Sequence, residues 1–155
     1  MLEYFLIGFL LVGVTVAIHA TGTSFWIQFV NQRYAGHDGS WKPRQHWQLF
    51  MFTAIVLIAL HSVEVVVWAL TYRWLPAATV LQTFEESVYF SLVTFTTLGY
   101  GDITLQPGPR LLSGIEAMNG ILLFGWSTAL FFAVFQRSWK TIHGGKNRAG
   151  GKGES

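Results

Sequence analysis

The sequence predicts an all-α membrane protein: three transmembrane helices plus a re-entrant pore helix, which enters and leaves the bilayer from the same side. Two observations carry this prediction. The chain of 155 residues is 52% hydrophobic and only 12% charged, whereas soluble domains carry about 25% charged residues. Its apolar residues also gather into runs long enough to cross a bilayer as a helix, which takes about 20 residues.

The three predicted spans follow from where charged residues are missing. No Asp, Glu, Lys or Arg interrupts three stretches, residues 4–32, 45–63 and 117–136. From these stretches, and the apolar pattern that continues beyond them, we expect helices at 1–32, 48–73 and 111–137. The first begins near Glu3 without a basic leader, so we interpret it as a retained helix and not as a cleaved secretory signal.

The basic residues predict the orientation. Eight of the ten Lys and Arg lie in the loop 33–47 or from Arg137 onward, and positive charge marks the cytoplasmic side. We therefore expect a multi-pass protein of the cell membrane, such as a bacterial inner membrane, with the N-terminus outside and a disordered basic tail, 138–155, in the cytoplasm. Because this tail follows an apolar run, we expect the lipid bilayer and no nucleic acid as its surroundings. The chain has no Cys, which excludes disulfides and thiolate metal sites.

A fourth uncharged stretch, residues 87–101, is too short to cross the membrane as a helix. It has 15 residues and runs into Gly99-Tyr100-Gly101-Asp102, a sequence that disfavours helix. We interpret it as re-entrant, a short helix followed by extended backbone. Non-helical backbone at membrane depth is tolerated only where it is buried in protein or lines a water-filled path. The stretch therefore predicts a pore or a cavity, and the alternative is an ordinary loop between two helices.

Thr96-Thr97-Leu98-Gly99-Tyr100-Gly101-Asp102 resembles the filter of the potassium-channel family, usually written T-T-V-G-Y-G-D. In that family, backbone carbonyls of four chains replace the water shell of K⁺, and glycines permit the left-handed backbone that the arrangement needs. The resemblance implies a pore domain over 48–137, with a pore helix at 84–96 and a filter at 97–102. It also implies that Thr97, Leu98, Gly99, Tyr100 and Gly101 bind K⁺, supported by Thr96, Asp102 and Tyr89.

What the resemblance implies for function is passive conduction of K⁺ by a homotetramer, with no catalysed reaction and no organic cofactor. A poorly selective cation channel is the alternative, and Tyr100 argues against it. Two departures stand out. Leu98 replaces the usual Val, which we expect to be tolerated, and Val93 stands where some members carry a Glu that partners the filter Asp. Inactivation behaviour is therefore left open, as are the gating stimulus and any accessory subunit.

We expect the residues that open and close the pore to lie in the last predicted span, 111–137. Gly120 lies where the family commonly has a hinge glycine, and Phe124, Thr128 and Phe132 share one stripe because they are spaced by four. We expect this stripe to line the cavity, with Phe132 as an apolar constriction. The alternative is that the Phe131-Phe132-Phe135 group packs against lipid.

Apart from residues near the span ends, the His and Glu residues inside the predicted spans are His19, His61, Glu64 and Glu116. Such residues are functional candidates by default. We expect His19 and His61 to meet near the midplane of the membrane, with Glu64 accepting a proton from either ring. Interhelical hydrogen bonding is the favoured interpretation, and a membrane-embedded metalloenzyme with a His/Glu metal or haem site is the alternative. Glu116 is expected to face the pore helix or the second helix as a structural partner.

Overall fold

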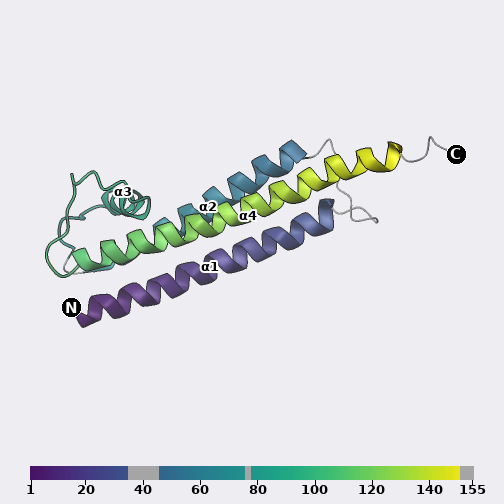
Figure 1. Ribbon diagram of the computed structural model, residues 1–155. Coiled ribbons are helices and arrows are strands. Elements are labelled where there is room, and N and C mark those ends of the chain that lie inside the picture. The colour runs from purple at the N-terminus through teal and green to yellow at the C-terminus, as the bar shows by residue number, and fades with distance from the viewer. Residues whose placement is uncertain (35–45, 76–77, 151–155) are drawn as a thin grey trace. The chain divides into compact units, whose positions relative to one another are not determined.

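The computed structural model describes residues 1–34, 46–75 and 78–150, with the side chains of these residues up to 137 except 34 and 46. It has four helices in these ranges and no strand (Figure 1), and their bounds are α1 Leu2–Tyr34, α2 His46–Trp74, α3 Phe84–Phe95 and α4 Arg110–Gly150. Three of them, α1, α2 and α4, are long and apolar enough to span a membrane. The predicted all-α fold with three spans and a short fourth helix is therefore confirmed.

The three long helices extend beyond their predicted C-terminal ends, whereas α3 ends at Phe95, one residue before its predicted end. The largest difference is in α4, which continues to Gly150, whereas we expected helix to 137 and disorder from 138. Once a helix has formed, each further residue adds a hydrogen bond at little cost, and no proline interrupts this part of the sequence. Most of the predicted cytoplasmic loop 33–47 and the end of the predicted tail, 151–155, lie outside the described residues.

The chain forms two compact units. One consists of residues 1–22 and 59–125, and the other of residues 23–58 and 126–155. The first unit contains α3 and the segment that follows it, and its core includes the fully buried side chains of Trp68, Tyr72, Phe95, Leu112 and Leu123. It is therefore the unit that positions the predicted filter.

The second unit has a smaller core. Val30 of α1, Leu49 of α2 and Val134 of α4 are buried together. The Trp26 indole donates a hydrogen bond to Thr53 Oγ1 at 3.1 Å, and the Arg137 guanidinium donates one to Asn31 Oδ1 at 2.9 Å. All three long helices thus contribute to this unit as well.

In the first unit, α1 is packed closely against both α2 and α4. A Cβ added at Gly8 would lie 2.5 Å from the Ile115 side chain of α4, and one added at Gly22 would lie 2.4 Å from Leu60 of α2. Asn119 of α4 also donates a hydrogen bond to the Thr15 hydroxyl of α1 at 2.7 Å. Small residues allow such close packing of helices in membranes, so the added first helix is an integral part of this unit.

The start of α3 is defined by a capping box. The Thr83 hydroxyl accepts a hydrogen bond from the Glu86 amide, and the Glu86 carboxylate accepts one from the Thr83 amide at 2.9 Å and one from the Gln82 amide at 2.7 Å. These satisfy amide groups that a helix start leaves without partners. The bonds from Thr83 and then Gln82 hold the pKa of Glu86 below its ordinary value.

Candidate ion-conducting site

The predicted filter has a backbone that alternates in handedness. Three of its residues, Thr97, Gly99 and Gly101, have positive φ angles of 59°, 57° and 79°. Thr97 is the sole non-glycine with positive φ in the part of the chain that the structure describes. We expected the left-handed angles at the two glycines, but Thr97 was missed, because a threonine in this conformation has no signal in the sequence.

The amide groups at the start of the filter donate hydrogen bonds to carbonyl groups near the end of α3. The amides of Leu98 and Gly99 donate to the Val93 carbonyl at 2.9 and 3.3 Å, and the Thr97 amide donates to the Thr94 carbonyl at 2.9 Å. In a trans peptide the N–H and C=O bonds of one plane point in opposite directions, and the described residues have no cis peptide. The carbonyls of residues 96, 97 and 98 therefore point away from α3.

Two side chains support the two ends of the filter. The Thr96 hydroxyl donates to the Leu92 carbonyl at 2.7 Å, and the Tyr89 hydroxyl donates to Asp102 Oδ2 at 2.8 Å. The bond to Asp102 raises the pKa of Tyr89 above its ordinary value of 10.0. Leu98 and Tyr100, in contrast, are 55% and 67% exposed. The filter is thus tied to its own pore helix, while these two side chains have little cover within the chain.

Val93 is buried beside the filter. It lines a hollow of about 380 Å³ between α3, the filter and the start of α4, which is also lined by Asp102, Arg110 and Ser113. Valine at position 93 offers Asp102 no carboxylate partner. Instead, the Tyr89 hydroxyl donates a hydrogen bond to Asp102, and this bond links α3 to the last residue of the predicted filter.

Glu116 on α4 makes hydrogen bonds to side chains of α2 and α3. We expected its side chain to face one of these two helices. Its carboxylate accepts a hydrogen bond from the Tyr72 hydroxyl at 2.8 Å and another from the Ser91 hydroxyl. The hydroxyl oxygen of Ser91 also lies 2.9 Å from the carbonyl oxygen of Val65. Tyr72 and Ser91 were not singled out from the sequence, although a polar residue on the buried side of an apolar helix was a usable signal.

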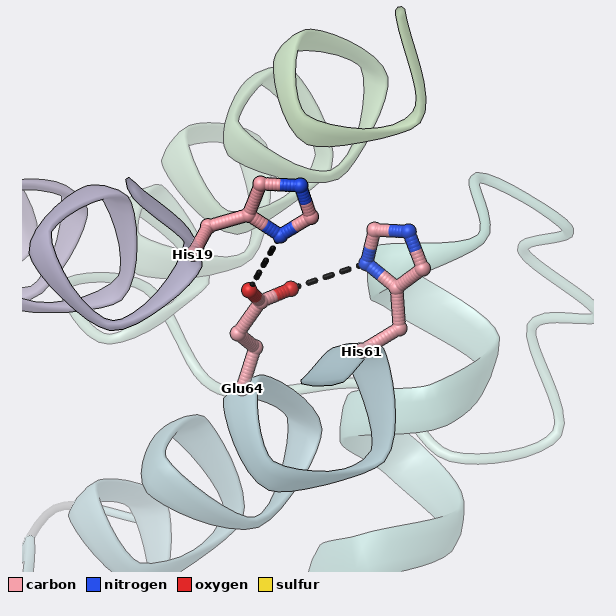
Figure 2. A group of neighbouring side chains, drawn as sticks. All are labelled: His19, His61 and Glu64. Carbon is pink, nitrogen blue, oxygen red and sulfur yellow. Dashed lines mark hydrogen bonds and ion pairs between the residues drawn. The ribbon is translucent and has the colours of Figure 1, made fainter. Parts of the chain in front are cut away.

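The other three intramembrane residues form a separate cluster, which does not include Glu116. His19 Nδ1 lies 2.8 Å from Glu64 Oε1, and His61 Nδ1 lies 2.8 Å from Glu64 Oε2. Figure 2 shows the carboxylate of Glu64 between the two rings, with His19 on α1 and the other two residues on α2. His19 and Glu64 are fully buried. The expected meeting of these three residues is confirmed.

The residues assigned to gating have different environments. A Cβ at Gly120 would lie 1.9 Å from the Phe95 carbonyl oxygen, so close packing of α4 against the end of α3 is by itself a reason for glycine there. Phe124 packs against Phe95 and His61, with ring centroids 5.5 and 4.7 Å apart. Phe124 therefore packs against α2 and α3. Thr128 and Phe132 are exposed and belong to the second unit. That the stripe lines a cavity stays a prediction.

Three helices are long and apolar enough to cross a membrane, and a short helix and a segment of alternating handedness lie between the last two in the sequence. These features are those of a multi-pass membrane protein. Residues 60–137 match the model of a family described as "Ion channel". The chain belongs to this family of two-transmembrane, potassium-channel-type domains, with an apolar helix added in front. No curated protein and no solved structure matches the chain.

Proposed function

We propose that this protein is a potassium-selective channel in which four identical chains surround one pore. The observation that carries the proposal is the left-handed backbone at every second residue of Thr97-Leu98-Gly99-Tyr100-Gly101. Together with amides turned toward α3, this backbone supports carbonyls that face a common axis. Rings of such carbonyls replace the hydration shell of K⁺, so K⁺ is the ion that we expect the filter to hold.

Apolar side chains that are exposed in a single chain support the homotetramer. Leu98 and Tyr100 of the filter, and Met118 and Ile121 of α4, are all more than half exposed. The filter is non-helical, and backbone of that kind does not face lipid but is buried in protein or lines a water-filled path. Both environments require other protein between the filter and the lipid. Each chain has one filter segment, and closed rings of identical chains are the common way to bury such a surface.

The orientation has its own support. The ring of Tyr4 lies 3.2 Å from the position that a Cβ at Gly108 would occupy, so the start of α1 is on the same side as the segment between α3 and α4. Eight of the ten Lys and Arg lie in the loop 33–47 or from Arg137 onward, and three helices that each cross the membrane once would put these segments on the other side. The positive-inside rule then places the N-terminus and the filter entrance outside the cell.

The test is a planar-bilayer recording of the purified protein with K⁺ on one side and Na⁺ on the other. We expect a reversal potential close to the K⁺ equilibrium potential. Equal permeability of K⁺ and Na⁺ would support the alternative of a poorly selective cation channel. Absence of any current from a correctly assembled protein would contradict both.

The first prediction concerns Gly99→Ala in this recording. A Cβ there meets nothing within 4 Å, so the effect must come from the left-handed backbone, where a side chain costs about 1–3 kcal/mol per chain. We expect the preference for K⁺ to be lost while the protein still assembles. Gly13→Ala in α1 is the matched control, because its Cβ also meets nothing, and it should keep the selectivity.

A further inference from the structure

The cluster of His19, His61 and Glu64 joins α1 to α2: His19 and Glu64 are 45 residues apart in the chain, and His61 and Glu64 are three apart. The three ligand atoms, one from each residue, lie within 4.8 Å of one another. Figure 2 shows both Nδ1 atoms turned toward the carboxylate. Three side chains that could coordinate one ion thus converge on one point inside the membrane-spanning part of the first unit.

The donor chemistry selects a class of ion. Alkali and alkaline-earth ions prefer sets made of oxygen alone, whereas two imidazole nitrogens and one carboxylate oxygen suit zinc and neighbouring transition-metal dications. Zinc holds such ligands at about 2.0–2.2 Å in a tetrahedron, which separates the ligand atoms by about 3.4 Å. Gathering the three ligand atoms, which lie within 4.8 Å of one another, round an ion therefore requires their widest separation to shrink by about 1.4 Å at most.

Electrostatics favours a cation at this place. A carboxylate removed from water is costly unless it is paired or coordinates a metal, and Glu64 is fully buried in a helix that can span the membrane. The two imidazoles contact its oxygens at 2.8 Å, and a dication at the same place would compensate its charge. With three protein ligands, a fourth position stays open for water, as in exchangeable zinc sites.

The cluster also touches the pore-forming segment. The His61 ring lies 6.0 Å from that of Phe95, the last residue of α3, and 4.7 Å from that of Phe124 on α4. Phe95 directly precedes Thr96 and Thr97 of the filter. Any shift of His61 toward a bound ion therefore changes packing against the end of the pore helix and against α4.

We propose that His19, His61 and Glu64 form a binding site for a transition-metal dication of the zinc class, and that its occupancy regulates the pore. Binding of the ion does not depend on the proposed potassium selectivity, whereas its effect on current rests on the protein being a channel. The two parts are therefore tested by separate measurements.

Binding is tested on the purified full-length protein in detergent, without an affinity tag, by dialysis against Zn²⁺ alone and metal analysis. We expect one Zn²⁺ per chain, and an affinity at least about tenfold lower in Glu64→Gln and in His19→Gln. Glu116→Gln is the matched control, since it removes another fully buried carboxylate of the same unit, and it should bind as wild type. Co²⁺ should give visible absorption in wild type and not in Glu64→Gln.

Equal Zn²⁺ affinity in wild type and in both cluster variants would overturn the site, as would an equal loss in Glu116→Gln. Both cluster variants are used because either one alone could fail to assemble, and each variant's mass in solution shows whether it has. In bilayers, Zn²⁺ should change the open probability of wild type and leave Glu64→Gln unaffected. Zn²⁺ that binds without changing the open probability would overturn the regulatory part alone.

Discussion

At the scale of single residues, the filter depends on backbone geometry and on a few hydrogen bonds. Thr97, Gly99 and Gly101 supply the left-handed positions, and a glycine adopts these angles at far less cost than a threonine. The Leu98 and Gly99 amides that bind the Val93 carbonyl help to hold this geometry. The energetically expensive residue is therefore Thr97, and α3 is what holds it in place.

The second prediction concerns Tyr89→Phe, which removes the hydroxyl that donates to Asp102. We expect the outer end of the filter to lose its tie to α3, so that single-channel bursts of K⁺ current become shorter. Asp102→Asn keeps an acceptor and should have a smaller effect. Bursts of unchanged length in Tyr89→Phe would show that the bond does not support the conducting filter.

The raised pKa of Tyr89 sets the direction in which pH affects the hydrogen bond between Tyr89 and Asp102. A group whose pKa is higher in the folded state contributes stability that is complete below its unfolded pKa and disappears as the pH rises through the folded one. The contact should therefore persist when the pH passes the ordinary tyrosine value of 10.0. Wild-type bursts should shorten toward those of Tyr89→Phe only at higher pH.

At the scale of elements, α3 is held at both ends, by its capping box and by the contacts of its last residue. The third prediction concerns the box. The pKa of Glu86 is lowered by the amides of Thr83 and Gln82, so its contribution to stability is complete above the ordinary value of 4.5 and is lost as the pH falls through the lowered pKa. Glu86→Gln should therefore be less heat-stable than wild type near neutral pH.

The difference between wild type and Glu86→Gln should shrink in acid, where the wild-type carboxylate is also neutral. The measurement is the thermal midpoint of the detergent-solubilised protein across this pH range. Glu85→Gln makes the same change of charge in the same turn without touching the capping box, and it serves as control. A gap between wild type and Glu86→Gln that stays constant with pH would contradict the assignment.

The fourth prediction separates two reasons for Gly120. If the residue served solely as a hinge, alanine would favour the helix by about 1 kcal/mol. The structure places the added Cβ 1.9 Å from the Phe95 carbonyl oxygen, and a clash of this kind costs about 1–3 kcal/mol. We therefore expect Gly120→Ala to lower the thermal midpoint. Gly125→Ala, whose Cβ meets nothing, should leave it unchanged or raise it.

At the scale of the whole molecule, the proposed channel needs more than one chain to form a pore. The fifth prediction is that the active protein is a homotetramer, with a native mass four times the chain mass of 17.4 kDa. Native mass spectrometry from detergent measures this directly. Gly99→Ala should keep the tetramer, because its Cβ contacts nothing in the chain. An active preparation that contains monomers or dimers alone would contradict the prediction.

The sequence by itself determined the class of fold, the three apolar helices and the position of the short fourth helix. These features depend on length, on missing charge and on a short motif, which are local properties of the chain. The meeting of His19 and His61, with Glu64 as their acceptor, was also predicted, because the two histidines lie at similar depths in their spans. A further signal was overlooked: Leu11, Thr15 and His19 are spaced by four and together form a buried face of α1.

Only the tertiary structure decided which hydroxyl groups Glu116 binds and that it lies apart from the His19–His61–Glu64 cluster. Glu116 and Glu64 are both fully buried carboxylates, yet Glu116 binds hydroxyls on α2 and α3 while Glu64 binds two imidazoles. Likewise, the proximity of Gly120 to the end of α3 has no trace in the local sequence. The physical reason is that depth in the membrane follows from the position along a helix, whereas the rotation of each helix depends on packing against its neighbours.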